Sequence, residues 1–134
     1  MEYHRGRLID HVHLRVADIE AAWTFYSAAL EVLGIPVQRI GEHAIACDEL
    51  WIDDTGTPTS GFHLAFQAPD EATIARFHAA GIAAGGTDNG APGPRDYHPG
   101  YYAAYVIAPD GTNVEAVLHG PATRSAPSVV LTAG

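Results

Sequence analysis

Two short stretches, each with a histidine on one face and apolar side chains on the other, constrain the fold of this chain more than any other feature. The first stretch, residues 8–16, alternates between apolar side chains and polar ones that include His11. The second stretch, residues 61–67, repeats this alternation with His63, which follows His11 by 52 positions. The pattern predicts two strands that pack through one face and present a histidine on the other.

The same shift of 52 positions relates the segments that follow the two stretches. Asp18 and Asp70 each precede a segment in which apolar residues recur at spacings of three and four, and Phe25 matches Phe77 under the shift. Helices are therefore predicted over residues 19–33 and about 70–82, and strands over residues 37–40, 44–47, 50–53, 101–107 and 113–119. Self-similarity of this kind is typical of a duplicated unit that contains a strand, a helix and further strands.

The chain therefore has an α+β pattern with two modules in one domain. Its 134 residues fit one compact domain, and a composition of 47% hydrophobic and 17% charged residues is typical of globular proteins. Module one covers about residues 7–54 and module two about residues 60–119. A tail without a clear period follows over residues 120–134.

The charged residues and the cysteine count limit the partners and the chemistry. Seven Lys and Arg against sixteen Asp and Glu give a net charge of −9, so nucleic acid and anionic membrane surfaces are expected to be repelled. No window reaches the roughly eighteen apolar residues needed to span a bilayer, and we expect a cytoplasmic protein. The single cysteine, Cys47, excludes an internal disulfide and a thiolate zinc site, so a metal site would use histidine and carboxylate ligands.

The last predicted strand places Glu115 among apolar residues. An unpaired buried carboxylate is costly, so this position implies a compensating charge, proton or metal. Together, His11, His63 and Glu115 supply two imidazoles and one carboxylate, a ligand set for Zn²⁺, Mn²⁺, Co²⁺, Ni²⁺ or non-haem Fe²⁺ with positions left for water or substrate. His13 and His119 are expected to face the same cavity, as partners of the ligands or as a general base.

A segment rich in glycine and proline, residues 88–100, lengthens the second module. So many Gly and Pro residues exclude a helix or a central strand, and a loop is therefore predicted. A plain surface connection and a binding loop or lid both stay open, although long loops in small domains often bind ligands. Arg95, Tyr97 and His98 are the candidate functional side chains of this segment.

Four stretches of the chain carry a resemblance to a known family. They are residues 9–18, 23–26, 62–66 and 108–115, and the last contains a Pro-Asp-Gly turn ahead of Glu115. Together they resemble the vicinal oxygen chelate superfamily, which includes glyoxalase I, extradiol ring-cleaving dioxygenases, fosfomycin-resistance thiol transferases and bleomycin-resistance proteins. The resemblance implies two tandem βαβββ modules that form a cup-shaped, partly closed mixed sheet, with the helices outside and a metal on the concave floor.

The resemblance also implies which residues hold the metal. His11 matches the ligand on the first strand of module one, His63 matches its counterpart in module two, and Glu115 matches the ligand on the final strand. The fourth family position falls among three residues that share a strand face, namely Glu49, Trp51 and Asp53. If Trp51 occupies it, the site has three protein ligands, the two His and one Glu that extradiol dioxygenases and fosfomycin-modifying enzymes use.

The function implied by the resemblance is that of a metal-dependent glyoxalase-like or dioxygenase-like enzyme, which acts on a small oxygen-bearing substrate chelated at the His-His-Glu site. The metal would be Fe, Mn, Zn, Ni or Co. The candidate catalytic residues are His13 and Tyr102, and the candidate substrate-binding residues are Trp51, Arg95, Tyr97 and His98. The alternative is a metal-free protein of the bleomycin-resistance type that binds a small molecule in an apolar groove. Similar proteins are often homodimers, so a homodimer is also an expectation.

Overall fold

The computed structural model describes residues 2–5, 8–122 and 129–132, and this part of the chain forms two helices and ten strands. In chain order they are β1 (Glu2–Arg5), β2 (Val12–Arg15), α1 (Ile19–Val32), β3 (Gln38–Ile40), β4 (Ala44–Cys47), β5 (Leu50–Asp53), β6 (His63–Gln67), α2 (Glu71–Ala83), β7 (Thr87–Pro94), β8 (Tyr102–Ile107), β9 (Asn113–Leu118) and β10 (Val129–Thr132). The order of elements from β2 to β5 recurs from β6 to β9, which confirms the predicted α+β fold of two βαβββ modules.

Each module folds into a mixed sheet of four strands with the same topology. The strand order is β2-β5-β4-β3 in module one and β6-β9-β8-β7 in module two. In each sheet the first two strands are parallel and the other neighbours are antiparallel. Within the described ranges the two sheets stay separate and are not closed. Of the predicted tail, β10 pairs with β1, and residues 123–128 and 133–134 lie outside the described residues.

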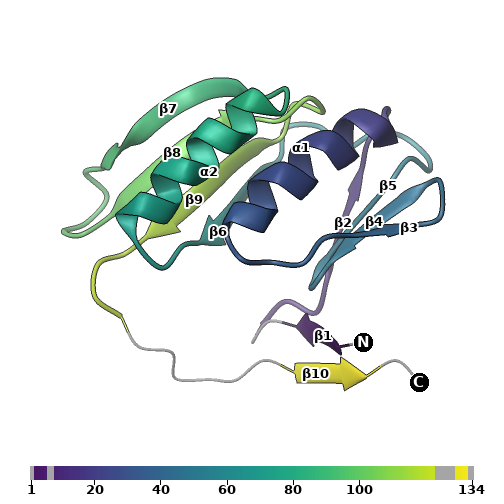
Figure 1. Ribbon diagram of the computed structural model, residues 1–134, viewed down its shortest axis with the longest axis horizontal. Helices are drawn as coiled ribbons and strands as arrows, with labels where there is room; N and C mark the ends of the chain where they lie inside the picture. Colours follow the sequence, from purple (N-terminus) through teal and green to yellow (C-terminus); the bar gives the residue numbers. More distant parts are fainter. Residues whose placement is uncertain (1, 6–7, 123–128, 133–134) are drawn as a thin grey trace.

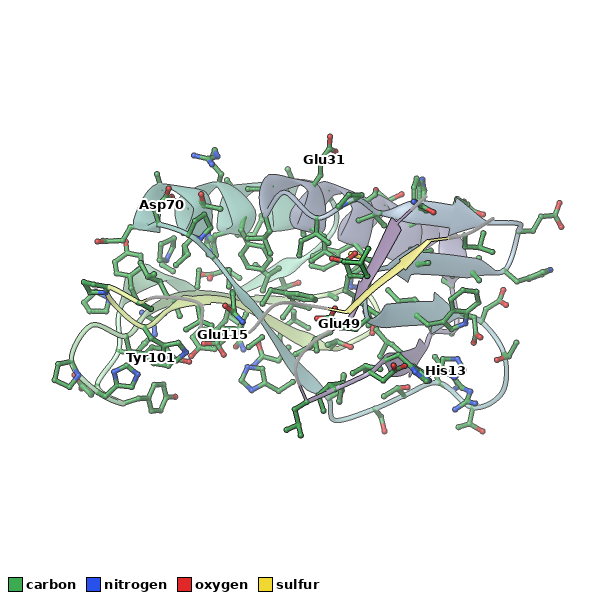
Figure 2. All side chains as sticks on the ribbon, turned by 90° about the horizontal axis from the view of Figure 1, so that it is seen from below. His13, Glu31, Glu49, Asp70, Tyr101 and Glu115 are labelled. Carbon is green, nitrogen blue, oxygen red and sulfur yellow. The ribbon has the colours of Figure 1, made fainter. Side chains whose placement is uncertain are left out.

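The two helices lie side by side and cover one face of the two sheets (Figure 1). Seen from below, the helices form one layer and the strands the other, and Glu31 of α1 points away from the strands (Figure 2). Glu115, Tyr101 and His13 lie on the opposite side, away from the helices (Figure 2). The face of the sheets that the helices leave uncovered therefore carries predicted site residues from both modules.

Both helices begin at the aspartates that the sequence predicts. The Asp18 carboxylate accepts hydrogen bonds from the backbone amides of Glu20 and Ala21 at 3.1 Å each, and Asp70 accepts one from the amide of Thr73 at 2.7 Å. The helices contain 14 and 13 residues. Neither helix of the described chain has the length and apolar character needed to cross a bilayer.

One hydrophobic core contains side chains of both modules. Phe25 of α1 and Phe77 of α2, which the 52-position shift relates, are both fully buried in it. Leu14 from β2 and Val114 from β9 belong to the same core. Because the two helices pack against each other over this shared core, their packing sets the position of one sheet relative to the other.

A buried hydrogen bond also joins the two modules. Tyr26 of α1 is fully buried, and its hydroxyl donates a hydrogen bond to Asp110 Oδ1, in the turn between β8 and β9, at 3.0 Å. Burial and the nearby Asp110 charge raise the pKa of Tyr26 far above its usual range, so the hydroxyl remains a donor. This bond adds a polar contact between the modules to the apolar core.

We expect the Tyr26→Phe substitution to lower the free energy of unfolding by about 1 kcal/mol, because one buried hydrogen bond is lost while the ring still fills the core. Urea denaturation of the parent and the variant measures the difference. Tyr97→Phe is the matched control, since Tyr97 is 70% exposed, and it should change the free energy by less than about 0.5 kcal/mol. Equal effects of the two substitutions would contradict the role of the Tyr26–Asp110 bond.

Two of the boundaries predicted from the sequence are wrong. Residues 88–100 do not form one loop, because β7 occupies the first part as the edge strand beside β8. Its register shifts between Asp88 and Gly90 and again before Gly93, and an edge strand tolerates proline since one side needs no ladder hydrogen bonds. The first strand of module one begins at Val12, so His11 precedes β2 and does not lie within it.

Candidate functional site

A carboxylate and an imidazole meet on module two, where β6 and β9 are parallel neighbours. His63 begins β6 and Glu115 lies within β9, with 2.8 Å between His63 Nε2 and Glu115 Oε1. The Glu115 side chain is only 2% exposed, whereas the His63 side chain is 52% exposed. The carboxylate is therefore buried with a partner, as the sequence predicts, while the imidazole remains open to solvent.

Two tyrosines complete this group of side chains, which we call the Glu115 cluster (His63, Tyr101, Tyr105 and Glu115). The Tyr101 hydroxyl donates a hydrogen bond to Glu115 Oε2, so both carboxylate oxygens have partners. The Tyr105 ring lies beside the His63 ring, with 6.0 Å between the centroids. Burial and the hydrogen bond to Glu115 raise the pKa of Tyr101, so its hydroxyl stays protonated and holds the carboxylate in place.

Tyr101 and Tyr105 were not among the predicted site residues, which included Tyr102. Tyr105 lies directly opposite Glu115 in the register of β8 and β9. Because side chains alternate along a strand, Tyr101 shares a face with Tyr105, and Tyr102 points to the other face. The register of the hairpin that ends in Glu115 is therefore the signal that could have identified both tyrosines.

Module one carries a second polar group of side chains around Asp53, which is buried. Its Oδ2 accepts hydrogen bonds from His13 Nε2 at 2.9 Å and from Trp51 Nε1 at 3.0 Å. Its Oδ1 accepts from the Thr55 hydroxyl at 2.6 Å and from the Thr55 amide at 3.1 Å. Burial alone would raise the pKa of Asp53, but the hydrogen bonds from Thr55, His13 and Trp51 outweigh it and hold that pKa well below its usual range.

The strand registers show which residue of β5 corresponds to Glu115 of β9. His13 pairs with Trp51 between β2 and β5, and Ala65 pairs with Glu115 between β6 and β9. His13 and Ala65 are related by the same 52-position shift as the helices. Trp51 is therefore the module-one counterpart of Glu115, and it contributes an indole N–H donor instead of a carboxylate.

His11 is not part of the Glu115 cluster. It lies ahead of β2 with its side chain 59% exposed, and its Nδ1 lies 2.7 Å from Asp10 Oδ1. Among the described residues, no group of three or more His, Cys, Asp or Glu side chains is placed to hold a metal ion. The structure thus brings together two of the three predicted ligands, His63 and Glu115, and leaves His11 apart.

The two ligand atoms that do meet fit part of a divalent-ion site. Zn²⁺ and related ions bind histidine nitrogen and carboxylate oxygen at about 2.0–2.2 Å, so two adjacent ligand atoms around one ion lie roughly 3 Å apart. The 2.8 Å between His63 Nε2 and Glu115 Oε1 is close to this separation. One imidazole and one carboxylate therefore fit neighbouring coordination positions, and further ligands must come from elsewhere.

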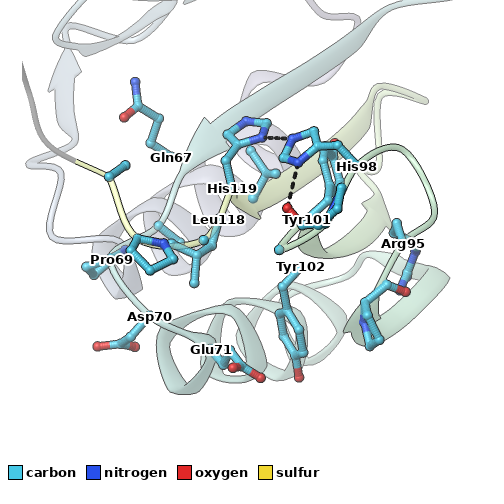
Figure 3. A pocket seen from close by; sticks show the side chains of 18 of the residues that line it. Gln67, Pro69, Asp70, Glu71, Arg95, His98, Tyr101, Tyr102, Leu118 and His119 are labelled. Atoms are coloured by element: carbon cyan, nitrogen blue, oxygen red, sulfur yellow. Dashed lines mark hydrogen bonds between the residues drawn. The ribbon is translucent and has the colours of Figure 1, made fainter.

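A cavity of about 1500 Å³ lies at the end of the second sheet, next to Tyr101 of the Glu115 cluster. Three predicted site residues, Arg95, His98 and Tyr102, line it, and so does His119 (Figure 3). Its lining does not include the described side chains of His11, His13, Trp51 or Tyr97. The predicted substrate-binding and catalytic residues are therefore divided between the cavity (Arg95, His98 and Tyr102), module one (His13 and Trp51) and the exposed Tyr97 of module two.

Arg95 has a structural role in this wall of the cavity. Its guanidinium group donates hydrogen bonds to the backbone carbonyls of Ala91, Gly93 and Pro94 at 2.8–3.2 Å. The same group lies over the Tyr105 ring, with 5.4 Å from Cζ to the centroid. Arg95 therefore anchors the end of β7 to the Glu115 cluster.

Comparison with known proteins finds a family model that matches most of the chain. A family model described as the Glyoxalase/Bleomycin resistance protein/Dioxygenase superfamily matches residues 8–116. No curated protein sequence gives a significant match to the chain.

Several solved structures share the fold. A glyoxalase/bleomycin resistance protein from Albidiferax ferrireducens T118 is 36% identical, with a TM-score of 0.69 over 80% of this chain and 95% of that chain. A glyoxalase-related enzyme from Fulvimarina pelagi is 19% identical, with a TM-score of 0.70 over 96% of this chain and 100% of that chain. A glyoxalase/bleomycin resistance protein/dioxygenase family enzyme from Burkholderia phytofirmans PsJN is 20% identical, with a TM-score of 0.63 over 81% of this chain and 96% of that chain. At such low identity the last two similarities concern the fold alone.

Proposed function

The chain belongs to the Glyoxalase/Bleomycin resistance protein/Dioxygenase superfamily, the vicinal oxygen chelate superfamily that its sequence resembles, and we propose that it is a metal-dependent enzyme acting on a small oxygen-bearing substrate. The observation that carries the proposal is the pair of His63 and buried Glu115 at 2.8 Å, on the sheet face that the helices leave open. In the proposal these two residues hold a divalent ion (Fe, Mn, Zn, Ni or Co), and His11 is the third ligand.

When bound, the ion supplies Lewis-acid stabilisation of negative charge on substrate oxygens. Tyr101 contributes by holding Glu115 through its hydroxyl hydrogen bond, and Tyr105 limits the position of the His63 ring. His13, held by Asp53, has the form of a general base oriented by a carboxylate, and Tyr102 faces the cavity. His13 stays the proposed residue for moving protons at the metal site, whereas Tyr102 points to the opposite sheet face from Glu115 and is proposed to move protons for a ligand in the cavity.

Elemental analysis of protein purified without a metal-affinity tag tests the metal site. We expect about one equivalent of divalent metal in the parent and less than about one tenth of that in Glu115→Gln and His63→Ala. His43→Ala is the matched control, because the His43 side chain is 73% exposed and pairs with Asp54 away from the cluster.

The third ligand is tested in the same series. The His11→Ala protein should also lose metal, because a single imidazole and a carboxylate bind a divalent ion weakly compared with a three-ligand set. Metal content in Glu115→Gln equal to that of the parent would overturn the proposed site. If Glu115→Gln and His63→Ala lose the metal but His11→Ala keeps it, His11 is not a ligand.

The cavity next to Tyr101 favours a second candidate, a metal-free protein that binds a small molecule. Its volume of about 1500 Å³ and its tyrosine lining suit an organic ligand. Ligand affinity that survives His63→Ala would favour this candidate, and affinity lost with the metal would favour the enzyme. Trp51, Arg95, Tyr97 and His98 stay the proposed substrate contacts of the enzyme, and of these four Arg95 and His98 line the cavity that the second candidate would use. Homodimer assembly and the cytoplasmic location stay predictions.

A further inference from the structure

Two histidines that the proposed metal site does not use face each other in the wall of the cavity (Figure 3). His98 lies in the loop between β7 and β8, and His119 follows the end of β9. His98 Nε2 and His119 Nδ1 are 2.9 Å apart, and the rings stack with an angle of 19° between their planes. Tyr101 packs edge-on against both rings, with centroid distances of 5.4 and 5.1 Å. We call these two residues the histidine pair.

The backbone is shaped to bring the histidine pair together. Gly100 adopts a left-handed conformation with φ +90°, and a Cβ there would lie 3.0 Å from the His119 carbonyl oxygen and 3.2 Å from Gly120 Cα. The two ends of the loop are joined, since the Arg95 backbone amide donates a hydrogen bond to the Tyr101 carbonyl oxygen at 2.9 Å. A side chain at position 100 would push the loop away from the strand end, so the contact between the histidines depends on glycine.

The hydrogen bonds determine where the protons of the neutral pair lie. His98 Nδ1 is 2.9 Å from the Pro99 carbonyl oxygen, which only accepts, so Nδ1 carries the proton and Nε2 has the lone pair. His119 Nδ1 must then donate to His98 Nε2. The lone pair of the neutral His119 ring is therefore on Nε2, and both side chains are exposed enough for a ligand to reach them.

The charges around the histidine pair select the ligand. Asp70, Glu71 and Asp96 line the cavity, and Arg95 is the one Lys or Arg among its described lining residues. The Arg95 guanidinium already donates to three backbone carbonyls, so the acidic side chains dominate and an anion is disfavoured. The Tyr101 ring, which packs edge-on against both histidines, supplies an aromatic wall. An uncharged or cationic aromatic ligand suits this surface best.

We propose that the histidine pair is an acid–base site in which His119 Nε2 accepts a proton from a hydroxyl group of an uncharged or cationic aromatic ligand in the cavity. His119 is the catalytic residue and His98 is the positioning residue, because His98 fixes the tautomer that leaves His119 Nε2 free. The site uses neither His63 nor Glu115, which do not line the cavity, although Tyr101 contacts both the histidine pair and Glu115. It needs no metal.

Hydrolysis of 4-nitrophenyl acetate, an uncharged aromatic ester, probes this base. In the assay a water molecule supplies the hydroxyl group: its proton moves to His119 Nε2 while its oxygen bonds to the ester carbonyl carbon. The bond from that carbon to the phenolic oxygen then breaks with its electron pair on oxygen, which gives acetic acid and 4-nitrophenolate, and the proton on His119 returns to solvent. A chelator in every reaction removes any contribution from bound metal, so the outcome is independent of the proposed metal site.

We expect His119→Gln to lower the hydrolysis rate above the uncatalysed background by about tenfold or more, since positioned general bases contribute at least that much. His98→Leu should lower this rate by a similar factor. His98→Gln should retain most of the rate, because the glutamine amide oxygen can still accept a hydrogen bond from His119 Nδ1. His43→Gln, which changes an exposed histidine away from the cavity, is the control and should match the parent.

Nitrogen-15 NMR of the parent protein gives an independent measurement of the tautomers. We expect the neutral His119 ring to carry its proton on Nδ1, and His98→Leu to remove this preference. A parent protein with the His119 proton on Nε2 would overturn the proposal. So would equal hydrolysis rates in His119→Gln and His43→Gln.

Discussion

We expect the Phe25→Ala protein to have a free energy of unfolding about 3–5 kcal/mol below that of the parent, because truncation of a buried phenylalanine leaves a cavity. Phe25 of α1 in module one is 0% exposed, and its ring lies beside Gly81 of α2 in module two. A Cβ on Gly81 of α2 would lie 3.4 Å from both Phe25 Cε1 and Val106 Cγ1 of β8. The cavity left by the substitution would therefore be bounded by both modules.

Urea denaturation followed by two probes measures this effect and tests whether the modules unfold together. Both tryptophans, Trp23 and Trp51, lie in module one, so fluorescence reports that module, whereas circular dichroism reports the whole chain. The transitions should coincide in the parent, since one core serves both modules. Phe66→Ala, at a partly buried position on β6, is the control and should lower the free energy of unfolding by less than Phe25→Ala does. A loss below about 1 kcal/mol in Phe25→Ala would contradict the shared core.

The fold could be predicted from the sequence because its local signals agree with its packing. Asp18 and Asp70 each cap the start of a helix, and the short apolar runs at residues 44–47 and 50–53 form β4 and β5 with the predicted bounds. Strand β7 could not be predicted in this way, since glycine and proline signal a loop until the topology places the segment at a sheet edge. Edge position is a property of the whole sheet.

The candidate site could be predicted only in part, because alternation gives the face of a side chain but not its neighbours. It placed His63 and Glu115 on one face, and β6 and β9 do meet in the sheet. His11 lies outside its strand, so the pattern of β2 does not fix its position. The contact between His98 and His119 depends on the left-handed backbone at Gly100, which no periodic pattern reports.

A second large effect is expected at Asp53, where Asp53→Asn should lower the free energy of unfolding at neutral pH by about 3 kcal/mol or more. Each carboxylate oxygen accepts two hydrogen bonds, one oxygen from Thr55 and the other from His13 and Trp51. An asparagine side chain has only one oxygen, so its NH₂ group must face one of these pairs of donors. Asp54→Asn is the neighbouring control. Because Asp54 pairs with the exposed His43, this substitution should lower the free energy of unfolding by less than about 1 kcal/mol.

The pH dependence of stability separates the charge of Asp53 from its shape. The hydrogen bonds hold the pKa of Asp53 below its usual value, so between about pH 5 and pH 3 the unfolded chain takes up a proton at this residue while the folded chain does not. The contribution of Asp53 to stability is therefore present above the pKa of the unfolded state and is lost as the pH falls towards the pKa of the folded state. Urea denaturation across this range should show a shallower loss of stability on acidification in Asp53→Asn than in the parent. An identical acid slope in the two proteins would mean that the Asp53 carboxylate is not held ionised by His13, Trp51 and Thr55.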